Sequence, residues 1–267
     1  MFSSCVQRKH RPFNIIRAVL GLTLLTLLTG SAAEAGNKDP EVWYIKQNGV
    51  LMGSYDVYVS DTGIRLENSK NHVIVVASAP SWTVTAFNSD SKIKWLGTIA
   101  NYRPTASTRR FMTIASDVPS NNAIKFPHQE PFSQFGLKGI KYFTDTAWTL
   151  KQKVLYEKNQ ISKQYPCMAS YFGAQDAIKA TQPIAILENL FDTPRMGLLP
   201  VDFHYKKITG HMENVLTTVS AKKQAPPRDW LTVPNGLSVV NSLEAINLDS
   251  TGRQGMDQWL DNIGTHR

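Results

Sequence analysis

Three side chains in the C-terminal half of the chain, those of His204, His211 and Glu213, could together bind zinc. Two imidazoles and one carboxylate are a zinc ligand set found in proteins, and a hairpin turn at Gly210 would bring the three residues close. The alternative is that both histidines lie on the surface or at a strand edge. Because nothing in the sequence supports the ligand geometry, we predict neither a metal site nor a cofactor.

The other residues that could do chemistry lack the partners that they would need. Cys167 could be a nucleophile only beside a positioned base, which the sequence does not identify. His128 and Glu130 form a weaker pair within a proline-rich stretch. The chain contains no Gly-x-Ser-x-Gly elbow, no His-Glu-x-x-His, no phosphate-binding glycine loop and no Cys-x-x-Cys. We therefore predict that the protein is not an enzyme.

Residues 43–96 have the pattern of an antiparallel meander. Short runs rich in Val, Ile, Tyr and Trp alternate with turn residues at near-regular intervals, which is typical of strands joined by hairpins. Turns are expected at residues 49–53, 61–63 and 88–91. The alternation predicts a sheet with one apolar, aromatic face, and this face must cover a closed core, a helix or a ligand.

Beyond residue 97 the strand pattern weakens and then returns. Four prolines between Thr98 and Gly139 predict a long loop, with a short strand possible at residues 110–115. A helix is predicted within Ala174 to Phe191, where Pro183 suits the first turn. Further strands are predicted at residues 140–143, 148–156, 199–205, 211–220 and 237–243, and a C-terminal helical face at Met256, Trp259, Leu260 and Ile263.

The first 35 residues have the features of a secretory signal peptide. Four basic residues precede the apolar run Ala18 to Leu28, and Ala33-Glu34-Ala35 is a small-x-small cleavage pattern. The alternative is a retained membrane anchor, but the uninterrupted apolar part is too short to span a bilayer. Cys5 precedes the apolar run, whereas the lipidated cysteine of a bacterial lipoprotein follows it. We predict an exported, periplasmic protein that is cleaved after Ala35 and has a single domain at residues 36–267.

The charge of the chain argues against nucleic acid as a partner. The formal net charge of +8 falls to +5 when residues 1–35 are removed, and no basic run of five or more residues occurs. The aromatic and basic signatures of nucleic-acid modules are absent from the sequence. A modest positive charge is compatible with transient contact with an anionic membrane surface, and is equally ordinary for an exported protein.

Two stretches resemble the superfamily of periplasmic lipoprotein carriers typified by LolA and LolB. Residues 186–194 (ILENLFDTP), followed by residues 197–201 (GLLPV), are similar to the end of a helix that leads into the next strand in related exported proteins. Residues 216–218 (LTT) and 230–239 (WLTVPNGLSV) resemble a closing segment that ends in a proline-glycine turn and a final strand. Residues 48–53 (NGVLMG) before the paired strands fit the same pattern.

The resemblance implies a mainly β fold with a few helices, in which a curved antiparallel sheet forms an incomplete barrel covered by helices and loops. It also implies a non-enzymatic carrier or binding protein whose apolar cavity holds lipid acyl chains or a lipoprotein. The alternative is an exported structural or protein-interaction domain with an ordinary closed core and no ligand. Family members carry an amphipathic helix before the first strand, whereas here only residues 36–41 precede it. The cover would therefore come from the Thr98–Gly139 loop or from the helix near Pro183.

The residues that would line such a cavity are the apolar members of the meander. Alternation alone says only that one face is buried, so the same residues could form ordinary core. The predicted ligand-lining candidates are Tyr55, Val57, Ile64, Leu66, Val73, Val75, Trp82, Val84, Ile93 and Trp95.

Overall fold

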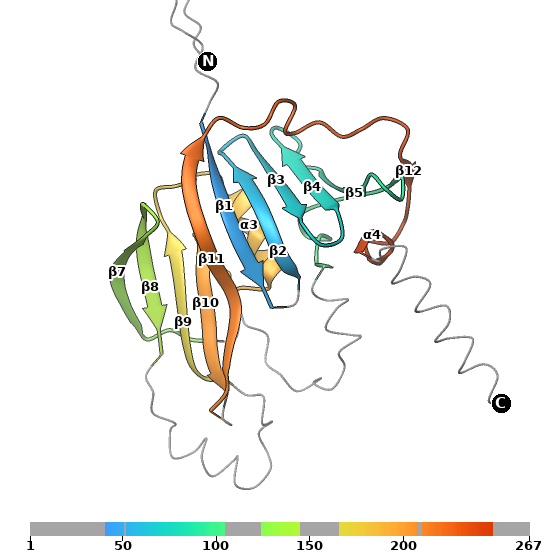
Figure 1. Ribbon diagram of the computed structural model, residues 1–267. Coiled ribbons are helices and arrows are strands. Elements are labelled where there is room, and N and C mark those ends of the chain that lie inside the picture. Colours follow the sequence, from blue (N-terminus) through green and yellow to red (C-terminus); the bar gives the residue numbers. More distant parts are fainter. Residues whose placement is uncertain (1–40, 51, 105–123, 145–165, 208–209, 248–267) are drawn as a thin grey trace, which may run out of the picture. The chain divides into compact units, whose positions relative to one another are not determined.

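The computed structural model describes residues 41–50, 52–104, 124–144, 166–207 and 210–247. By its internal contacts the chain divides into residues 1–37 and residues 38–267, and the first of these units lies outside the described residues. The described residues form one twelve-stranded sheet and two helices (Figure 1). The strands are β1 (Val42–Gly49), β2 (Gly53–Val59), β3 (Gly63–Asn68), β4 (Val73–Ser78), β5 (Val84–Asn88), β6 (Ile93–Gly97), β7 (His128–Gln134), β8 (Leu137–Phe143), β9 (Pro166–Ala174), β10 (Leu199–Lys207), β11 (Met212–Gln224) and β12 (Ser238–Val239), and the helices are α3 (Thr181–Phe191) and α4 (Glu244–Asn247).

The sheet is open, with β12 at one edge and β7 at the other. Its order is β12-β6-β5-β4-β3-β2-β1-β11-β10-β9-β8-β7, and every pairing is antiparallel except that of β12 with β6. The first strand therefore pairs with β11, near the end of the described chain, and this pairing joins the two halves of the sheet. The predicted fold class is confirmed: the protein is mainly β, with few helices and one large sheet that does not close.

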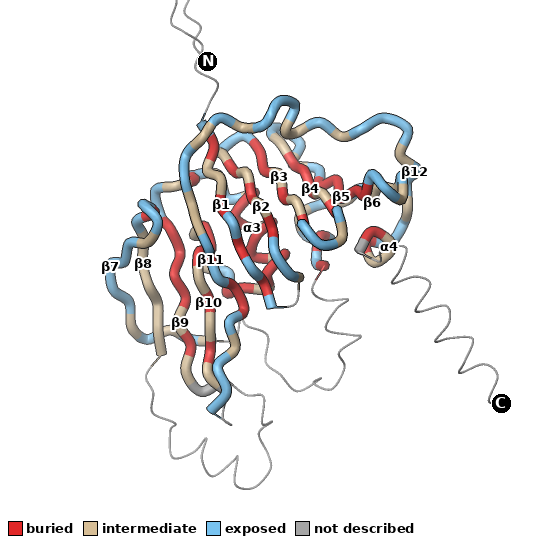
Figure 2. The backbone as a smooth tube through the Cα atoms, viewed as in Figure 1, coloured by how far each residue is buried: buried red, intermediate tan, exposed pale blue. Residues whose placement is uncertain are grey.

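Alternation along the strands creates two faces with different surroundings. We call the face that contacts α3 the inner face and the opposite one the outer face. Along β2 the inner-face residues Tyr55, Val57 and Val59 are buried, whereas Asp56 and Tyr58 are only partly buried. Buried and more exposed residues alternate in the same way along neighbouring strands (Figure 2). The period of two that the sequence predicts for a half-buried sheet is therefore confirmed in β1 to β3, whereas every residue of β5 is buried.

The helix α3 lies behind β1 and β2 in Figure 1, on the inner face of the sheet. Pro183 occupies its first turn, where the missing N–H costs no intrahelical bond. Asp192 ends the helix in the left-handed conformation, and its successor Thr193 donates its N–H to the carbonyl of Glu188. The predicted helix end at residues 192–194 is thus confirmed, and the helix Thr181–Phe191 lies within the predicted region with Pro183 in its first turn.

The segment after β11 crosses the outer face of the meander before β12 pairs with β6. Arg65 Nη1 donates to the carbonyl of Trp230 at 3.1 Å. A Cβ on Gly63 would lie 2.6 Å from the side chain of Leu231, so the two chains approach closely here. Phe87, an outer-face residue of β5, is only 1% exposed and lines a hollow together with Trp230. The outer face of β3 to β5 is therefore partly covered.

Two strands occupy regions where none was expected, and one predicted strand is shorter. The Thr98–Gly139 region was predicted to be a loop because of its prolines, but it contains β7 and the start of β8. β7 is the edge strand and Pro131 lies within it, and edge strands are where proline is tolerated in a sheet. β9 was not predicted at all, because PCMASYFGA lacks apolar alternation. Only Ser238–Val239 of the predicted 237–243 strand is a strand.

Several predicted elements cannot be compared with the structure. The possible strand at residues 110–115, the strand pattern at residues 148–156 and the helical face from Met256 to Ile263 all lie outside the described residues. Within the described part, no helix is both long enough and apolar enough to cross a membrane.

Candidate functional site

The structure places the ten ligand-lining candidates in or against one apolar cluster on the inner face. Eight of them belong to the buried cluster, and the remaining two, Trp82 and Ile93, are partly buried and pack against it. The same cluster includes four residues of α3: Ile186, Leu187, Leu190 and Phe191. The inner face is thus continuous from the meander to α3, while α4 contacts it at β5 and β6.

The contact between α3 and the sheet is tightest at Phe191. Its ring meets the Tyr55 ring edge to face, with the ring centroids 5.8 Å apart. A Cβ on Gly49 would lie 2.7 Å from Phe191 Cδ1, well inside ordinary van der Waals distance. β1 therefore needs a glycine at this position because the phenyl ring rests directly on its backbone.

Polar contacts hold α3 at its two ends. Asp61 Oδ1 accepts the N–H groups of Lys179 and Ala180, at 2.6 and 2.9 Å, just before the helix begins. Near the other end, Asn189 Nδ2 donates to the carbonyl of Ile99 at 2.8 Å. These bonds tie the helix to the β2–β3 turn and to the segment after β6.

A small polar centre is embedded in the inner face beside α3. Gln47 is fully buried, and its Nε2 donates to the Pro200 carbonyl and to Thr218 Oγ1. Thr218 Oγ1 in turn donates to the Val201 carbonyl at 2.6 Å. Gln47 Oε1 has no hydrogen-bond partner within the described part of the chain. An acceptor left in this position costs free energy that a bonded water or ligand hydroxyl would recover.

Burial controls the ionisation of the phenols on this face. It raises the pKa of Tyr55 to about 12 and the pKa values of Tyr102 and Tyr171 well above the ordinary value, chiefly by desolvation. The carboxyl of Glu188, on α3, also has a raised pKa because it is buried, although N–H groups of Met196 and Gly197 donate to its Oε1. The inner face is therefore an environment that disfavours charge.

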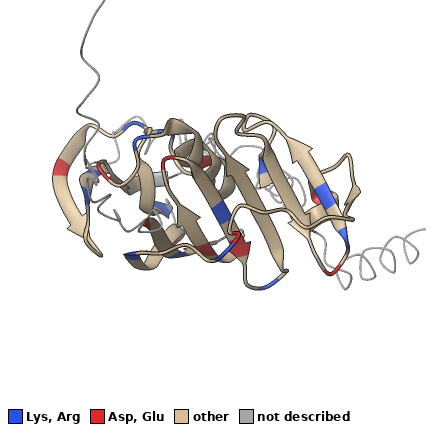
Figure 3. Cartoon of the chain, turned by 90° about the horizontal axis from the view of Figure 1, so that it is seen from above, with Lys and Arg blue, Asp and Glu red and all other residues tan. Residues whose placement is uncertain are grey.

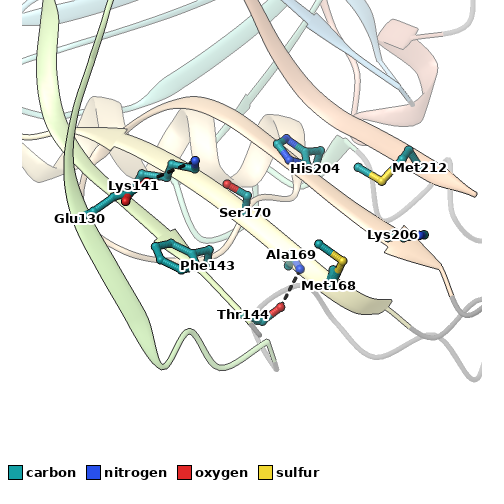
Figure 4. A pocket seen from close by; sticks show the side chains of 10 residues that line it. All are labelled: Glu130, Lys141, Phe143, Thr144, Met168, Ala169, Ser170, His204, Lys206 and Met212. Atoms are coloured by element: carbon teal, nitrogen blue, oxygen red, sulfur yellow. Dashed lines mark hydrogen bonds and ion pairs between the residues drawn. The ribbon is translucent and has the colours of Figure 1, made fainter. Parts of the chain in front are cut away.

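A second hollow, of about 480 Å³, lies on the outer face of β8 to β11 (Figure 4). We call it the outer groove. It is lined by Glu130, Lys141, Phe143, Thr144, Met168, Ala169, Ser170, His204, Lys206 and Met212. None of the ten inner-face candidates lines it, because they belong to the meander from β2 to β6 and not to these strands.

An ion pair and a contact between a histidine and a carboxylate organise the side chains around this groove. Lys141 Nζ lies 3.3 Å from Glu130 Oε1, and it also lies over the rings of Phe132 and Phe143. His204 Nδ1 lies 3.2 Å from Asp202 Oδ2, two residues earlier on the same strand. The Asp202 carboxylate can hold the imidazole in one orientation, with Nε2 left for other contacts.

Ser170 lies directly opposite His204 in the β9–β10 register. Together with Asp202 these residue types form a nucleophile, base and orienting carboxylate. Within the described residues, however, no hydrogen bond joins Ser170 to His204, and Figure 4 shows Ser170 Oγ directed toward Lys141. A nucleophile needs the bond to its base, so the geometry does not favour this chemistry.

The three residues with a zinc-ligand pattern do not converge. His204 pairs with Asn214 on the outer face, whereas Glu213 pairs with the inward-facing Tyr205. His211 Nε2 lies 3.9 Å from Glu213 Oε2, and no group of three or more His, Cys, Asp or Glu residues in the described part could hold a metal ion. The β10–β11 hairpin brings His204 and Glu213 to neighbouring strands, but alternation places their side chains on opposite faces.

Charged side chains are interspersed over the described sheet. Figure 3 shows Lys and Arg mixed with Asp and Glu, without one broad region of a single sign. On the outer face the rings of Tyr44 and Tyr58 are tilted with their centroids 5.0 Å apart, and the Tyr44 hydroxyl donates to Asp56 Oδ1, beside Lys46. Burial and this hydrogen bond raise the pKa of Tyr44 to about 12. This part of the outer face is an ordinary polar strand surface.

The sequence did not predict the outer groove. Its residues come from five strands, and β7 and β9 were not expected. The residue types gave no sign either, because Met168 and Met212 belong to no catalytic or metal motif and only the pairing of β9, β10 and β11 brings them near His204. A strand pattern at residues 166–174 would have been needed to place Met168 beside His204 from the sequence.

Comparisons with known proteins leave the family open. No family model and no curated protein sequence matches the chain. Among solved structures, an uncharacterised conserved protein from Thermus thermophilus aligns with 76% of this chain and 91% of its own length, at 11% sequence identity and a TM-score of 0.36.

Proposed function

We propose that the protein is an exported, non-enzymatic carrier or binding protein for a lipid or a lipidated protein, and that the acyl chain binds on the inner face in exchange for α3. The observation that supports this proposal is the continuous apolar inner face of an open sheet, with α3 lying on it. Such a face needs a cover, which either a helix or acyl chains can supply. The proposed site contains Tyr55, Val57, Ile64, Leu66, Val73, Val75, Trp82, Val84, Ile93 and Trp95.

The exchange of α3 for an acyl chain is close to balanced in free energy. Removing four large apolar side chains of α3 from the sheet would cost about 6–12 kcal/mol, at about 1.5–3 kcal/mol for each. Burying an acyl chain of about 14 methylenes would contribute about 11 kcal/mol, at about 0.8 kcal/mol for each. The two terms are of similar size, so the inner face would not hold α3 far more strongly than an acyl chain.

A second candidate function is an exported structural or protein-interaction domain with a closed core. It is favoured by the burial of the candidates themselves, since Val57, Ile64 and Leu66 are 0% exposed and pack against other side chains of the protein. In that case α3 would stay in place permanently, and the inner face would have no ligand.

Site-specific photo-crosslinking can distinguish the two functions. The crosslinker p-benzoylphenylalanine would replace Trp82, which packs partly exposed against the inner cluster, in protein exported by a two-membrane bacterium. The matched control is the same replacement at Tyr58, an aromatic residue of the outer face. The carrier proposal predicts an acyl-lipid adduct at position 82 but not at position 58, detected by intact-protein mass spectrometry after irradiation.

Native mass spectrometry of the unmodified protein, released gently from the same cells, gives a second readout. A bound lipid mass that is lost on organic extraction would support the carrier. If position 82 gives no adduct and the native protein carries no lipid, the carrier proposal is refuted and the closed-core function is supported.

A further inference from the structure

We propose that the outer groove is a binding site for a soft monovalent metal ion, Cu(I), with the thioether sulfurs of Met168 and Met212 and the Nε2 of His204 as ligands. This site is separate from the inner face, and its existence does not depend on lipid binding. Thioether and imidazole groups suit Cu(I), whereas harder cations prefer sets of carboxylate ligands.

The strand register brings the three ligands together. Met168 on β9 and Met212 on β11 are the direct cross-strand partners of Lys206 on β10, one on each side. His204 lies two residues from Lys206 on the same strand, and therefore on the same face. Diagonal neighbours of this kind have Cα atoms about 7–8 Å apart, within reach of long side chains.

Figure 4 shows how the side chains lie in the groove. The Met212 side chain extends toward His204 in this view, and the Met168 side chain lies lower, on β9. All three residues line the same hollow of about 480 Å³. Methionine is unbranched and flexible, so its sulfur can approach an ion with little change in the backbone.

The contact between Asp202 and His204 is the one expected around a metal-binding histidine. Asp202 Oδ2 lies 3.2 Å from His204 Nδ1, so the carboxylate can accept the Nδ1 proton. This leaves the lone pair on Nε2, which is the atom that binds the ion. Carboxylates placed in this way orient the ring and make the histidine a better ligand.

Met212 is accessible, since 45% of its surface is exposed. Its thioether can therefore be reached by an ion from solvent. Lys206, by contrast, carries a positive charge into the lining of the same groove. Like charges repel, so Lys206 should weaken cation binding and its neutralisation should strengthen it.

The test is an affinity measurement with Cu(I), kept reduced and free of oxygen, in competition with a chromogenic Cu(I) chelator. Ag(I), which undergoes no redox change, would be titrated in parallel by calorimetry. Every variant carries Cys167→Ser, because a free thiol would bind either ion regardless of the groove. We expect one ion to bind per chain, and the titration with Zn(II) to show at least tenfold weaker binding.

The variants separate a site from incidental binding. Met168→Leu and Met212→Leu conserve volume, and each should weaken Cu(I) binding at least tenfold. Asp202→Asn should weaken it about 10- to 100-fold, as for other residues that orient a ligand. Lys206→Gln should tighten it, a change that no general loss of structure could produce. The matched control is His211→Ala, whose side chain is 69% exposed beside Met212 but outside the groove, and it should bind as the parent does.

Either of two results would overturn the proposal. The first is that neither Ag(I) nor Cu(I) binds stoichiometrically, and the second is that the Met168→Leu/Met212→Leu double variant binds Cu(I) as tightly as the parent. Circular dichroism of each variant confirms that the sheet is retained. If only His211→Ala lowers the affinity, the ions bind at the exposed hairpin, and the outer groove is not the site.

Discussion

The contact between Gly49 and Phe191 allows a quantitative test of how α3 is held. In Gly49→Ala the new methyl group would lie 2.7 Å from Phe191 Cδ1 and 3.0 Å from Cε1. Carbon atoms pack at about 3.5–4.0 Å, so the ring would have to move by most of an ångström. Phe191 is 2% exposed and packs edge to face on Tyr55, so the movement would disturb both contacts. We expect Gly49→Ala to lower the free energy of unfolding by about 1–3 kcal/mol.

The double variant identifies the cause of this loss. Phe191→Leu removes the ring carbons that the new methyl group would meet, so Gly49→Ala should cost less in that background, with a coupling energy of about 1 kcal/mol. Urea denaturation followed by tryptophan fluorescence and circular dichroism gives the four free energies of unfolding. If the two single effects simply add, the ring does not rest on β1 and the described position of α3 is refuted.

Three further perturbations test the contacts around α3. Thr218→Val leaves the buried Val201 carbonyl without its 2.6 Å donor and should cost about 1–3 kcal/mol in urea denaturation, whereas the exposed Thr217→Val should change stability by less than about 0.5 kcal/mol. Asp61→Ala removes the acceptor of two N–H groups before α3 and should cost about 1 kcal/mol, with Asp61→Asn losing less. Burial raises the pKa of Glu188 in the folded state, so the folded protein binds this proton more tightly than the unfolded chain. The stability that this provides is present at acidic pH and is lost as the pH rises through the carboxyl range. The free energy of unfolding of the wild type minus that of Glu188→Gln should therefore fall from pH 4 to pH 7. A rise in this difference would contradict the burial argument.

The sequence predicts the meander well because its information there is local. In β2 and β3 buried apolar residues, such as Val57 and Leu66, occur at every second position. The turn at residues 61–63 separates the two strands. Each strand pairs with the next along the chain, so no long-range information is needed. The helix end at Asp192 is equally local, since Pro194 follows it within two residues.

Prediction fails where position in the sheet decides the structure. Pro131 reads as a loop signal, but an edge strand such as β7 tolerates proline. β9 carries Gly173, at which an added Cβ would lie 2.5 Å from Leu198 Cβ, so packing against a distant segment selects a residue that weakens the strand signal. The pairing of β1 with β11 joins residues about 170 positions apart, which no local pattern encodes.

The inner face and the outer groove share strands but should respond independently to substitution. On β10, Phe203 and Tyr205 belong to the inner cluster, whereas His204 lines the outer groove. Because successive side chains point to opposite faces, a change at His204 leaves the packing of α3 intact, and a change at Phe191 leaves the groove intact. Free energies of distant sites without shared partners add within about 0.3–0.5 kcal/mol. A lipid effect of a groove variant, or a metal effect of an α3 variant, would therefore mean that the sheet itself changes its curvature or register when either ligand binds.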